Sequence, residues 1–439
     1  MKSIGVIGGG LLGLNVARRL SDEGFIVTIL EADSEIGGLL RHYTQNNYKW
    51  DEFYHVILPD DKYTLEMISD LGLKKDLYWA KTKTGFFIDG GHYSMSNLID
   101  FLKFPTLGLF DKFRLGLTII IATYLSNFKR LEKIPVNTWL QFWSGNNIFL
   151  KIWLPLLKAK LGEDYQSASA SFIVATIRRL YGSRKGVSKN EVFGYLNGGY
   201  SHILEAIKRE IEVRNINLIT DFNVEGILEL KGKQLAVSSG NGNQFCFDYV
   251  ISTIPSFLTA GICSDALIKE KKQLKNVKYL GVICVSLLLK NQVSQFYVTN
   301  ITDDKINLTG IIEMTALTGN SFYGGNSLIY LPKYLRPDDP MFENTDEEIK
   351  ERFVASLKII SPSLANENII DWHVAKARFV ITFPQMGYSK KLPLFKTSIS
   401  NLFIINSSFI VDGILNVNET LKVSENYLPQ IVSFINSNE

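Results

Sequence analysis

The first 31 residues alternate short apolar runs with one glycine-rich turn. Residues 2–7 form an apolar run that predicts a strand, and residues 26–30 predict a second strand that ends at Glu31. Between them the sequence Gly8-Gly9-Gly10-Leu11-Leu12-Gly13 enters a stretch with helical apolar periodicity. The order strand, glycine turn, helix, strand is typical of a βαβ dinucleotide-binding unit.

The glycines of this turn have separate physical roles. Gly8 permits the tight turn out of the strand, Gly10 lets a pyrophosphate approach the backbone, and Gly13 lets the helix pack on the strand. Phosphates then lie at the helix N-terminus, where unpaired N–H groups favour negative charge. Glu31, at the end of the second strand, is expected to accept hydrogen bonds from ribose hydroxyls and to repel a 2′-phosphate, which disfavours NADP.

A second glycine motif indicates the size of the dinucleotide. An acidic loop follows Glu31 and ends at the adjacent Gly37 and Gly38. Two such glycines let the chain fold back beneath the pyrophosphate and ribityl groups of a cofactor as long as FAD. The motif is unusual in simple NAD dehydrogenases, so we predict FAD.

With these two motifs the chain resembles the superfamily of flavin-containing amine oxidases, protoporphyrinogen oxidases and carotenoid desaturases. Three later segments are similar to family features: residues 50–55, 194–200 and 248–255, with Val224 in a short strand between the last two. The resemblance implies contacts with FAD at twelve positions, which are Gly8, Gly10, Leu12, Gly13, Glu31, Ala32, Gly37, Gly38, Leu39, Val224, Ser407 and Asn418.

The chain departs from the family pattern at two places. Many amine oxidases carry an arginine directly after the glycine pair, whereas here Leu39 and Leu40 come before Arg41. The C-terminal segment, residues 401–420, lacks the usual Gly-Asp pair and second glycine-rich helix start. Polar groups such as Ser407 and Asn418 remain available there to a flavin.

The predicted fold class is α/β, with a Rossmann-type FAD-binding domain that is discontinuous in sequence. We assign residues 1–60, 190–255 and 376–439 to this domain. Residues 61–189 and 256–375 then form a substrate domain, a mixed sheet with a helical cap at 90–189, because 61–189 has helical periods and 270–335 has strand-like runs. Asn241-Gly242 predicts a hairpin turn, and no second Rossmann unit is visible.

Composition and charge limit the classes of partner that the protein is expected to bind. The chain has 439 residues, 46% hydrophobic, and a net charge of only +3, without a basic stretch interleaved with aromatics, so nucleic acid is not expected. The three cysteines form no C-x-x-C pair, and the histidines show no metal-ligand spacing, so we expect neither disulfide nor metal. A strand directly at the amino terminus leaves no room for a signal peptide, which favours a cytoplasmic protein.

Residues 104–125 permit two interpretations. Residues 117–125 are apolar, but Asp111, Lys112 and Arg114 interrupt the run, which is too short to span a bilayer. The first interpretation is a buried helix that roofs the substrate cavity. The alternative is peripheral membrane contact, with the four residues Phe104, Leu107, Leu109 and Phe110 at the interface and a lipidic substrate.

Two side chains are candidates for chemistry. His55 is the best candidate for a base or flavin-facing polar group, although a structural histidine bonded to the backbone fits equally well. Arg378 could anchor a substrate carboxylate or phosphate, and its alternative is a surface salt bridge. Arg178, Arg179, Arg184 and Lys185 form a basic cluster that is interpreted as a solvated helix face rather than as an anionic-substrate site.

Three functions fit these observations. In the first, the protein oxidises or desaturates a small organic substrate, an amine or a polyene-like or porphyrinogen-like molecule, by hydride transfer to flavin N5, and oxygen or a quinone reoxidises the flavin. In the second, the flavin acts without net redox change, as in nucleotide-sugar mutases. In the third, the protein binds FAD but is catalytically inactive. The sequence leaves the substrate, the electron acceptor and the oligomeric state open.

Overall fold

The N-terminal motif lies in a five-stranded parallel sheet. A computed structural model of the protein describes residues 1–182, 184–185, 190–263, 268–303 and 305–437. The strand order is β10 (Asn217–Ile219), β2 (Ile26–Leu30), β1 (Ser3–Ile7), β14 (Tyr249–Ser252) and β20 (Leu402–Ile404). Each neighbouring pair is parallel. Its strands therefore come from three distant parts of the sequence.

Both faces of this sheet are covered, as a parallel sheet requires. On one face lie the helices α1 (Leu11–Asp22), α10 (Tyr200–Val213) and α15 (Val417–Ser437), which share an apolar core with the sheet. On the other face lies an antiparallel sheet of β11 (Val224–Glu229), β12 (Leu235–Ser239) and β13 (Gln244–Phe247). The β12–β13 turn contains Gly242 at φ +85°, which confirms the predicted hairpin.

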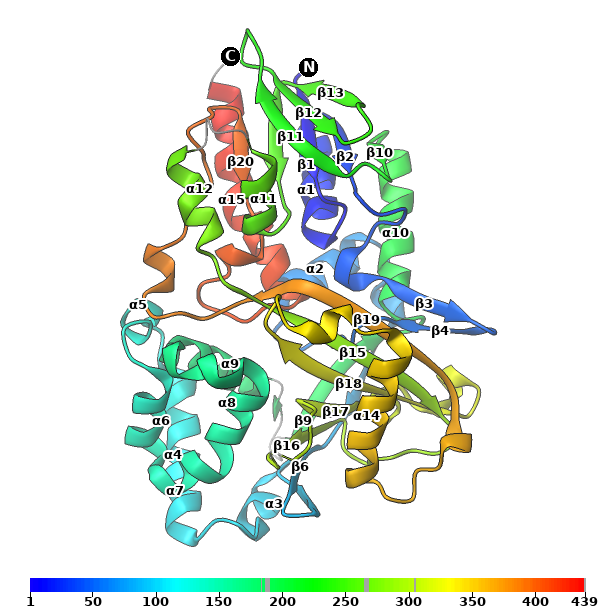
Figure 1. Ribbon diagram of the computed structural model, residues 1–439, viewed down its shortest axis with the longest axis vertical. Coiled ribbons are helices and arrows are strands. Elements are labelled where there is room, and N and C mark those ends of the chain that lie inside the picture. Colours follow the sequence, from blue (N-terminus) through cyan, green and yellow to red (C-terminus); the bar gives the residue numbers. More distant parts are fainter. Residues whose placement is uncertain (183, 186–189, 264–267, 304, 438–439) are drawn as a thin grey trace.

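A seven-stranded mixed sheet crosses the middle of the molecule (Figure 1). Its order is β19 (Ile369–Thr382), β15 (Tyr279–Leu289), β18 (Ser327–Leu335), β17 (Gly310–Glu313), β16 (Val298–Ile301), β6 (Thr84–Ile88) and β7 (Gly91–Ser94). All residues of β15 are buried. Its alternate side chains enter two cores, since Ile283 and Val285 pack with α14 (Asp346–Ile360) while Cys284 packs toward the parallel sheet.

The helical part lies at the lower left of Figure 1, at the opposite end from both termini. It comprises α3 (Leu98–Lys103), α4 (Leu109–Tyr124), α5 (Phe128–Leu131), α6 (Val136–Ser144), α7 (Asn146–Ile148), α8 (Leu154–Leu161) and α9 (Ala170–Gly182). A separate apolar core holds these helices together, with Trp139, Phe149 and Leu157 among its buried members. The predicted α/β class with a discontinuous Rossmann-type domain, a mixed sheet and a helical cap is confirmed.

Shorter elements connect these parts. They are the hairpin β3 (His42–Gln45) and β4 (Tyr48–Asp51), the helices α2 (Lys62–Asp70), α11 (Ser256–Ile262), α12 (Ile268–Lys275) and α13 (Thr315–Thr318), and a small sheet of β5 (Leu77–Lys81), β9 (Asn190–Leu196) and β8 (Arg184–Lys185). The predicted boundary at residue 376 falls inside β19, because that strand continues to Thr382 within the seven-stranded sheet.

Candidate functional site

In the turn between β1 and α1, the backbone of the turn packs directly against the backbone of the helix. Gly8 has φ +104°, a conformation that L side chains rarely adopt. A Cβ atom on Gly13 would lie 1.9 Å from the carbonyl oxygen of Gly8, so helix and turn can approach only because Gly13 has no side chain. At Gly10, by contrast, a Cβ atom would meet nothing within 4 Å. The space in front of Gly10 is therefore open to a ligand.

The N-terminus of α1 is suited to an anion. The helix begins at Leu11, its N-cap is Gly10 without any side-chain hydrogen bond, and its first turn carries no acidic residue. Helix N-termini with free N–H groups bind phosphates. Leu12 lies in this first turn with its side chain buried in the core.

The structure places the second glycine motif beside the first. The N–H of Gly37 donates to the carbonyl of Gly9 at 2.8 Å, and Gly10 and Gly37 form a parallel bridge. Gly37 and Gly38 have φ values of +123° and +53°. Leu39 follows in a half-buried turn (Gly38–Leu40). The two motifs, separated by more than twenty residues, thus form one glycine-lined ledge.

Glu31 lies at the carboxyl end of β2 and is anchored by the backbone. Its carboxylate accepts the N–H groups of Gly9 and Asp33, the latter at 2.9 Å. A carboxylate offers about four acceptor positions, so two of them remain for a ligand hydroxyl. The anchoring holds the carboxylate in place at the rim of the ledge.

A cavity of about 460 Å³ opens beside this rim. Four predicted cofactor residues line it together: Gly8, Glu31, Ala32 and Val224. Other lining residues, which no sequence signal indicated, come from α11, α12 and the segment before β11, and they include Phe222, Asn223, Phe257, Leu258 and Lys275. The walls are mainly apolar, with one carboxylate and one ammonium group. Such a cavity fits a flat aromatic base attached to a ribose.

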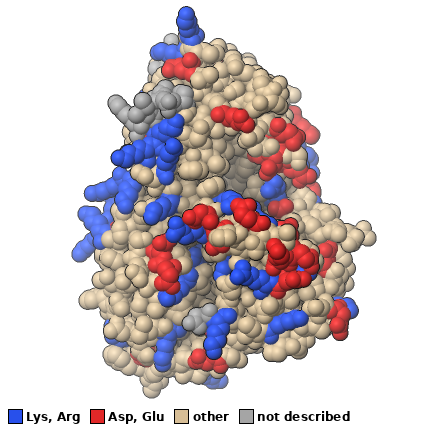
Figure 2. Space-filling view, viewed as in Figure 1, with Lys and Arg blue, Asp and Glu red and all other residues tan. Residues whose placement is uncertain are grey.

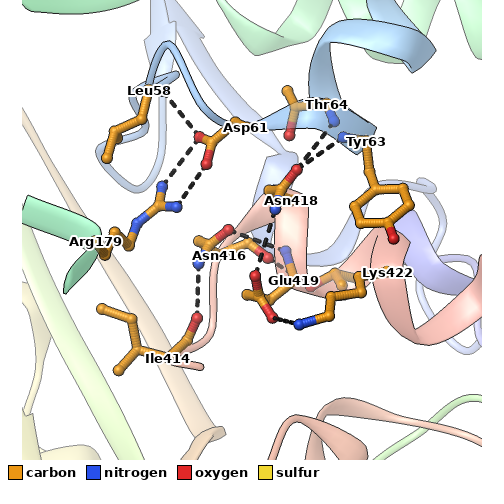
Figure 3. A network of polar contacts seen from close by, with 11 residues as sticks. Leu58, Asp61, Tyr63, Thr64, Arg179, Ile414, Asn416, Asn418, Glu419 and Lys422 are labelled. Atoms are coloured by element: carbon orange, nitrogen blue, oxygen red, sulfur yellow. Dashed lines mark hydrogen bonds and ion pairs between the residues drawn. The ribbon is translucent and has the colours of Figure 1, made fainter. Parts of the chain in front are cut away.

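The C-terminal contributors lie after β20, at the same edge of the parallel sheet. Ser407 begins a turn (Ser407–Phe409), and Asn418 lies in the first turn of α15. The side-chain oxygen of Asn418 accepts the N–H of Tyr63 at 2.9 Å, so this amide joins α15 to α2 (Figure 3). The start of α15 is capped by Asn416, whose side-chain oxygen accepts the N–H of Glu419 at 3.0 Å (Figure 3).

A largely buried ion pair beside this helix links α9 of the cap to the segment that precedes α2. Arg179 of α9 donates to both carboxylate oxygens of Asp61, at 2.7 and 3.1 Å, and Asp61 also accepts the N–H of Leu58 (Figure 3). The interpretation of Arg179 as part of a solvated face is therefore wrong, because its partner was not visible in the sequence. The side chains of Arg184 and Lys185 lie outside the described part of the chain.

His55 lies against a tyrosine. Its ring centre is 4.6 Å from that of Tyr200, and its Nδ1 is a buried atom with no hydrogen-bond partner among the described residues. Burial lowers the pKa of His55 to about 4. The imidazole is neutral at physiological pH and retains a free nitrogen.

Asp51, which sequence reasoning missed, is the most strongly buried carboxyl group near His55. It accepts the Tyr195 hydroxyl at 2.5 Å and the N–H of Tyr200 at 3.1 Å. Burial raises the pKa of Asp51 to about 7, although both hydrogen bonds act in the opposite direction. A fully buried carboxyl group gives no sequence signal, because its partners lie about 150 residues away.

A second polar cluster lies where the cap meets the seven-stranded sheet. The hydroxyls of Tyr54 and Tyr334 are 3.1 Å apart, and Nζ of Lys160 lies 3.5 Å from the centre of the Tyr334 ring. Burial lowers the pKa of Lys160 and raises that of Tyr334 to about 12. The cluster places two hydroxyls and an amine in surroundings that are otherwise apolar.

Arg378 lies apart from these groups. Its guanidinium forms an ion pair with Glu343 at 2.5 Å, donates to the carbonyl of Pro337, and covers the ring of Phe342. These contacts match the surface salt bridge named as its alternative. The geometry gives no reason to place Arg378 at a substrate.

Comparisons with known proteins agree with this arrangement. The model of the flavin containing amine oxidoreductase family matches residues 13–410. Protoporphyrinogen oxidase 2 of Arabidopsis thaliana is 31% identical over 117 residues, which are 26% of this chain and 23% of that relative. The chain thus matches about a quarter of the length of this curated relative.

Two solved structures share the fold over almost the whole chain. Wild-type putrescine oxidase bound to putrescine has a TM-score of 0.74 at 16% identity and covers 98% of this chain and 99% of its own. Reduced UDP-galactopyranose mutase has a TM-score of 0.73 at 14% identity, covering 98% and 94%. The protein therefore shares its fold with putrescine oxidase and UDP-galactopyranose mutase.

From the family match we conclude that the chain belongs to the flavin-containing amine oxidoreductases. Within the described residues, no group of three or more His, Cys, Asp or Glu side chains is arranged to hold a metal ion. No helix in the described ranges is long and apolar enough to cross a membrane.

Proposed function

We propose that the protein binds FAD across the glycine-lined ledge and oxidises a C–H bond of a small organic molecule. The observation that supports FAD most strongly is the ledge itself, where Gly10 leaves open space beside a helix N-terminus and Gly37 lies next to it. The adenosine would occupy the cavity lined by Glu31, Ala32 and Val224. A second glycine turn in this position fits a cofactor longer than NAD.

FAD, when bound, supplies an acceptor for a hydride at N5, and oxygen or a quinone takes the electrons afterwards. The chain's own residues then orient the substrate and exclude water. His55 is neutral above a pH of about 4, and its Nδ1 is available for a hydrogen bond to a ligand. The substrate class we propose is an amine or a polyene-like or porphyrinogen-like molecule, because flavin N5 takes a hydride from a C–H bond beside nitrogen or within a conjugating system.

A second candidate function is a nucleotide-sugar mutase reaction without net redox change. The specific observation in its favour is the similarity to UDP-galactopyranose mutase over 98% of this chain. A catalytically inactive FAD-binding protein is the third candidate, since the C-terminal segment departs from the family pattern.

The first test is the visible spectrum of the purified protein, followed by acid release of the cofactor. We expect released FAD in wild-type protein and none in Gly10→Val, because the added side chain fills the open space at the backbone. The matched control is Gly116→Val on α4, where a Cβ atom also meets nothing within 4 Å. Gly10→Val protein that is folded and retains stoichiometric FAD would refute the proposed binding mode.

The second test distinguishes the three functions. A panel of amines and polyenes is added anaerobically to the oxidised protein, and bleaching of the flavin band is followed. Bleaching by one of them supports the oxidoreductase. Binding of a nucleotide sugar without bleaching supports the mutase, and no response to either class supports the inactive binder.

A further inference from the structure

The outward face of α4 is apolar along its whole length. The six residues Leu109, Phe110, Phe113, Leu117, Ile120 and Tyr124 are between 40% and 83% exposed. At about 100° per residue they all fall within one arc of about 100° on the helix surface. The opposite face, with Leu115, Thr118 and Ala122, is buried in the core of the helical part. No charged side chain falls within the exposed arc.

The exposed arc continues onto neighbouring helices. Lys112 donates to the carbonyl of Leu102 on α3, and Arg114 donates to the carbonyl of Phe142 on α6. Leu102 and Phe142 are themselves 51% and 72% exposed. Single exposed apolar residues are common on soluble proteins, but a continuous apolar face indicates an interaction surface. We call this surface the α4 face.

The segment of the chain that contains α4 is basic. Residues 98–151 contain seven Lys and Arg against three Asp and Glu, in a chain whose net charge is only +3. Each of the three acids is bound by nearby groups, since Asp100 accepts from Ser94 and Asn97, Asp111 from Asn147, and Glu132 from Ser389. Several of the cations are exposed: Lys103, Lys129, Arg130, Lys133 and Lys151. Figure 2 shows that charged side chains gather across the middle of the pictured face, while its lower left, over the helical part, is mostly tan.

We propose that the α4 face docks on the surface of an anionic lipid bilayer, with α4 lying in the plane of the membrane. An interfacial helix buries its apolar face at the boundary between headgroups and acyl chains, while basic side chains bind anionic headgroups. A second copy of the chain fits less well, because a two-fold dimer through this face would bring together two segments of net positive charge. The proposal does not depend on FAD or on the reaction.

The structure also changes which residues form this contact. Phe104 and Leu107, named in the sequence interpretation, are only 1% and 4% exposed and belong to the core of the helical part. The exposed positions are instead spaced at helical intervals from Leu109 to Tyr124. One face of α4 is therefore buried and the other exposed, and Leu109 and Phe110 of the sequence interpretation lie on the exposed face.

Co-sedimentation with vesicles tests the proposal. Full-length protein is mixed with vesicles of phosphatidylcholine alone or of phosphatidylcholine with phosphatidylglycerol, and sedimentation velocity is recorded without lipid. We expect binding to the anionic vesicles, weaker binding to the neutral ones, and a monomer in solution. The double variant Phe110→Glu, Phe113→Glu should bind about a hundredfold more weakly, because two large apolar side chains leave the interface.

The matched control is Val213→Glu with Leu394→Glu, which makes the same charge change at side chains 77% and 76% exposed elsewhere. Circular dichroism verifies that both double variants are folded. The proposal is overturned if wild-type protein does not bind anionic vesicles, or if the control loses binding equally. It is also overturned if wild-type protein is a dimer that only the Phe110 and Phe113 variant dissociates, which would assign the face to a second copy.

Discussion

At the edge of the parallel sheet, glycines lie where two backbone segments approach each other closely, whereas α4 carries large side chains on both of its faces. Gly13 packs against the carbonyl of Gly8 and tolerates no Cβ atom. On α4, Leu115 is buried and Leu117 is 40% exposed, although both are the same residue type two positions apart. Close backbone contacts define the first region, so few residue types are tolerated at its positions. The second is defined by packing partners that are distant in the sequence.

The same type of substitution, glycine to alanine, should change the stability of the protein in opposite directions in the two regions. Gly13→Ala is expected to destabilise the protein by about 3 kcal/mol or more and to abolish flavin binding, because the new methyl group overlaps backbone. Gly116→Ala on α4 should stabilise by about 0.5–1 kcal/mol, because alanine is the better helix former and the site is open. Thermal unfolding and the flavin spectrum measure both effects. Equal shifts of Tm in the two variants would contradict the comparison.

Asp51, at the boundary between the two sheets, predicts a pH dependence of the protein's stability. Its pKa is raised to about 7 in the folded protein, against an ordinary value of 3.8, so the folded state binds the extra proton between these pH values. Stability from this group is therefore greatest at low pH and falls as the pH rises toward 7, by about 2–3 kcal/mol between pH 5 and 8. Asp51→Asn should remove this part of the pH dependence.

The measurement is chemical denaturation of wild-type and Asp51→Asn protein at pH 5 and pH 8. The asparagine can still accept the N–H of Tyr200, so the fold is expected to persist. Asp371→Asn is a control at a half-buried carboxylate outside this network. A variant with the same pH slope as the wild type would show that Asp51 is already ionised throughout this range.

The smallest effect concerns the exposed arc of α4. Leu117→Ala should change the free energy of unfolding by less than about 0.5 kcal/mol, because its side chain is partly in water. Leu115→Ala, on the buried face, is expected to cost about 2–5 kcal/mol. Urea unfolding without lipid compares the two. A large loss in Leu117→Ala would mean that this side chain packs against protein.

The sequence predicted the fold class and the phosphate turn because both depend on local chemistry. Glycines at fixed spacing between two strands have few alternative explanations, and the resemblance extended the assignment to Ala32 and Val224, which share a cavity with Glu31. By contrast, the structure gives three side chains their surroundings through contacts with residues 100 or more positions away. They are Asp51, Lys160 and Arg179. A single amino-acid sequence does not indicate which distant residues are in contact.

Helical periodicity also left the direction of each apolar face undecided. The pattern at 104–125 indicates that apolar side chains line a helix, but both faces of α4 are apolar, so periodicity alone does not say which faces the core. The boundary near residue 376 was missed for a related reason. The strand β19 reads continuously, and only its pairing with β15 assigns it to the larger sheet.

The parallel sheet has a consequence for how the protein is made. Its central strand β1 pairs with β14 about 240 residues later in the sequence, and β14 pairs with β20 about 150 residues further on. Domains fold as units during synthesis, and pairings distant in sequence form slowly. The glycine-lined ledge therefore gains its final neighbours only after strands about 400 residues apart have been brought together. Flavin binding during refolding is therefore expected to follow the assembly of this sheet.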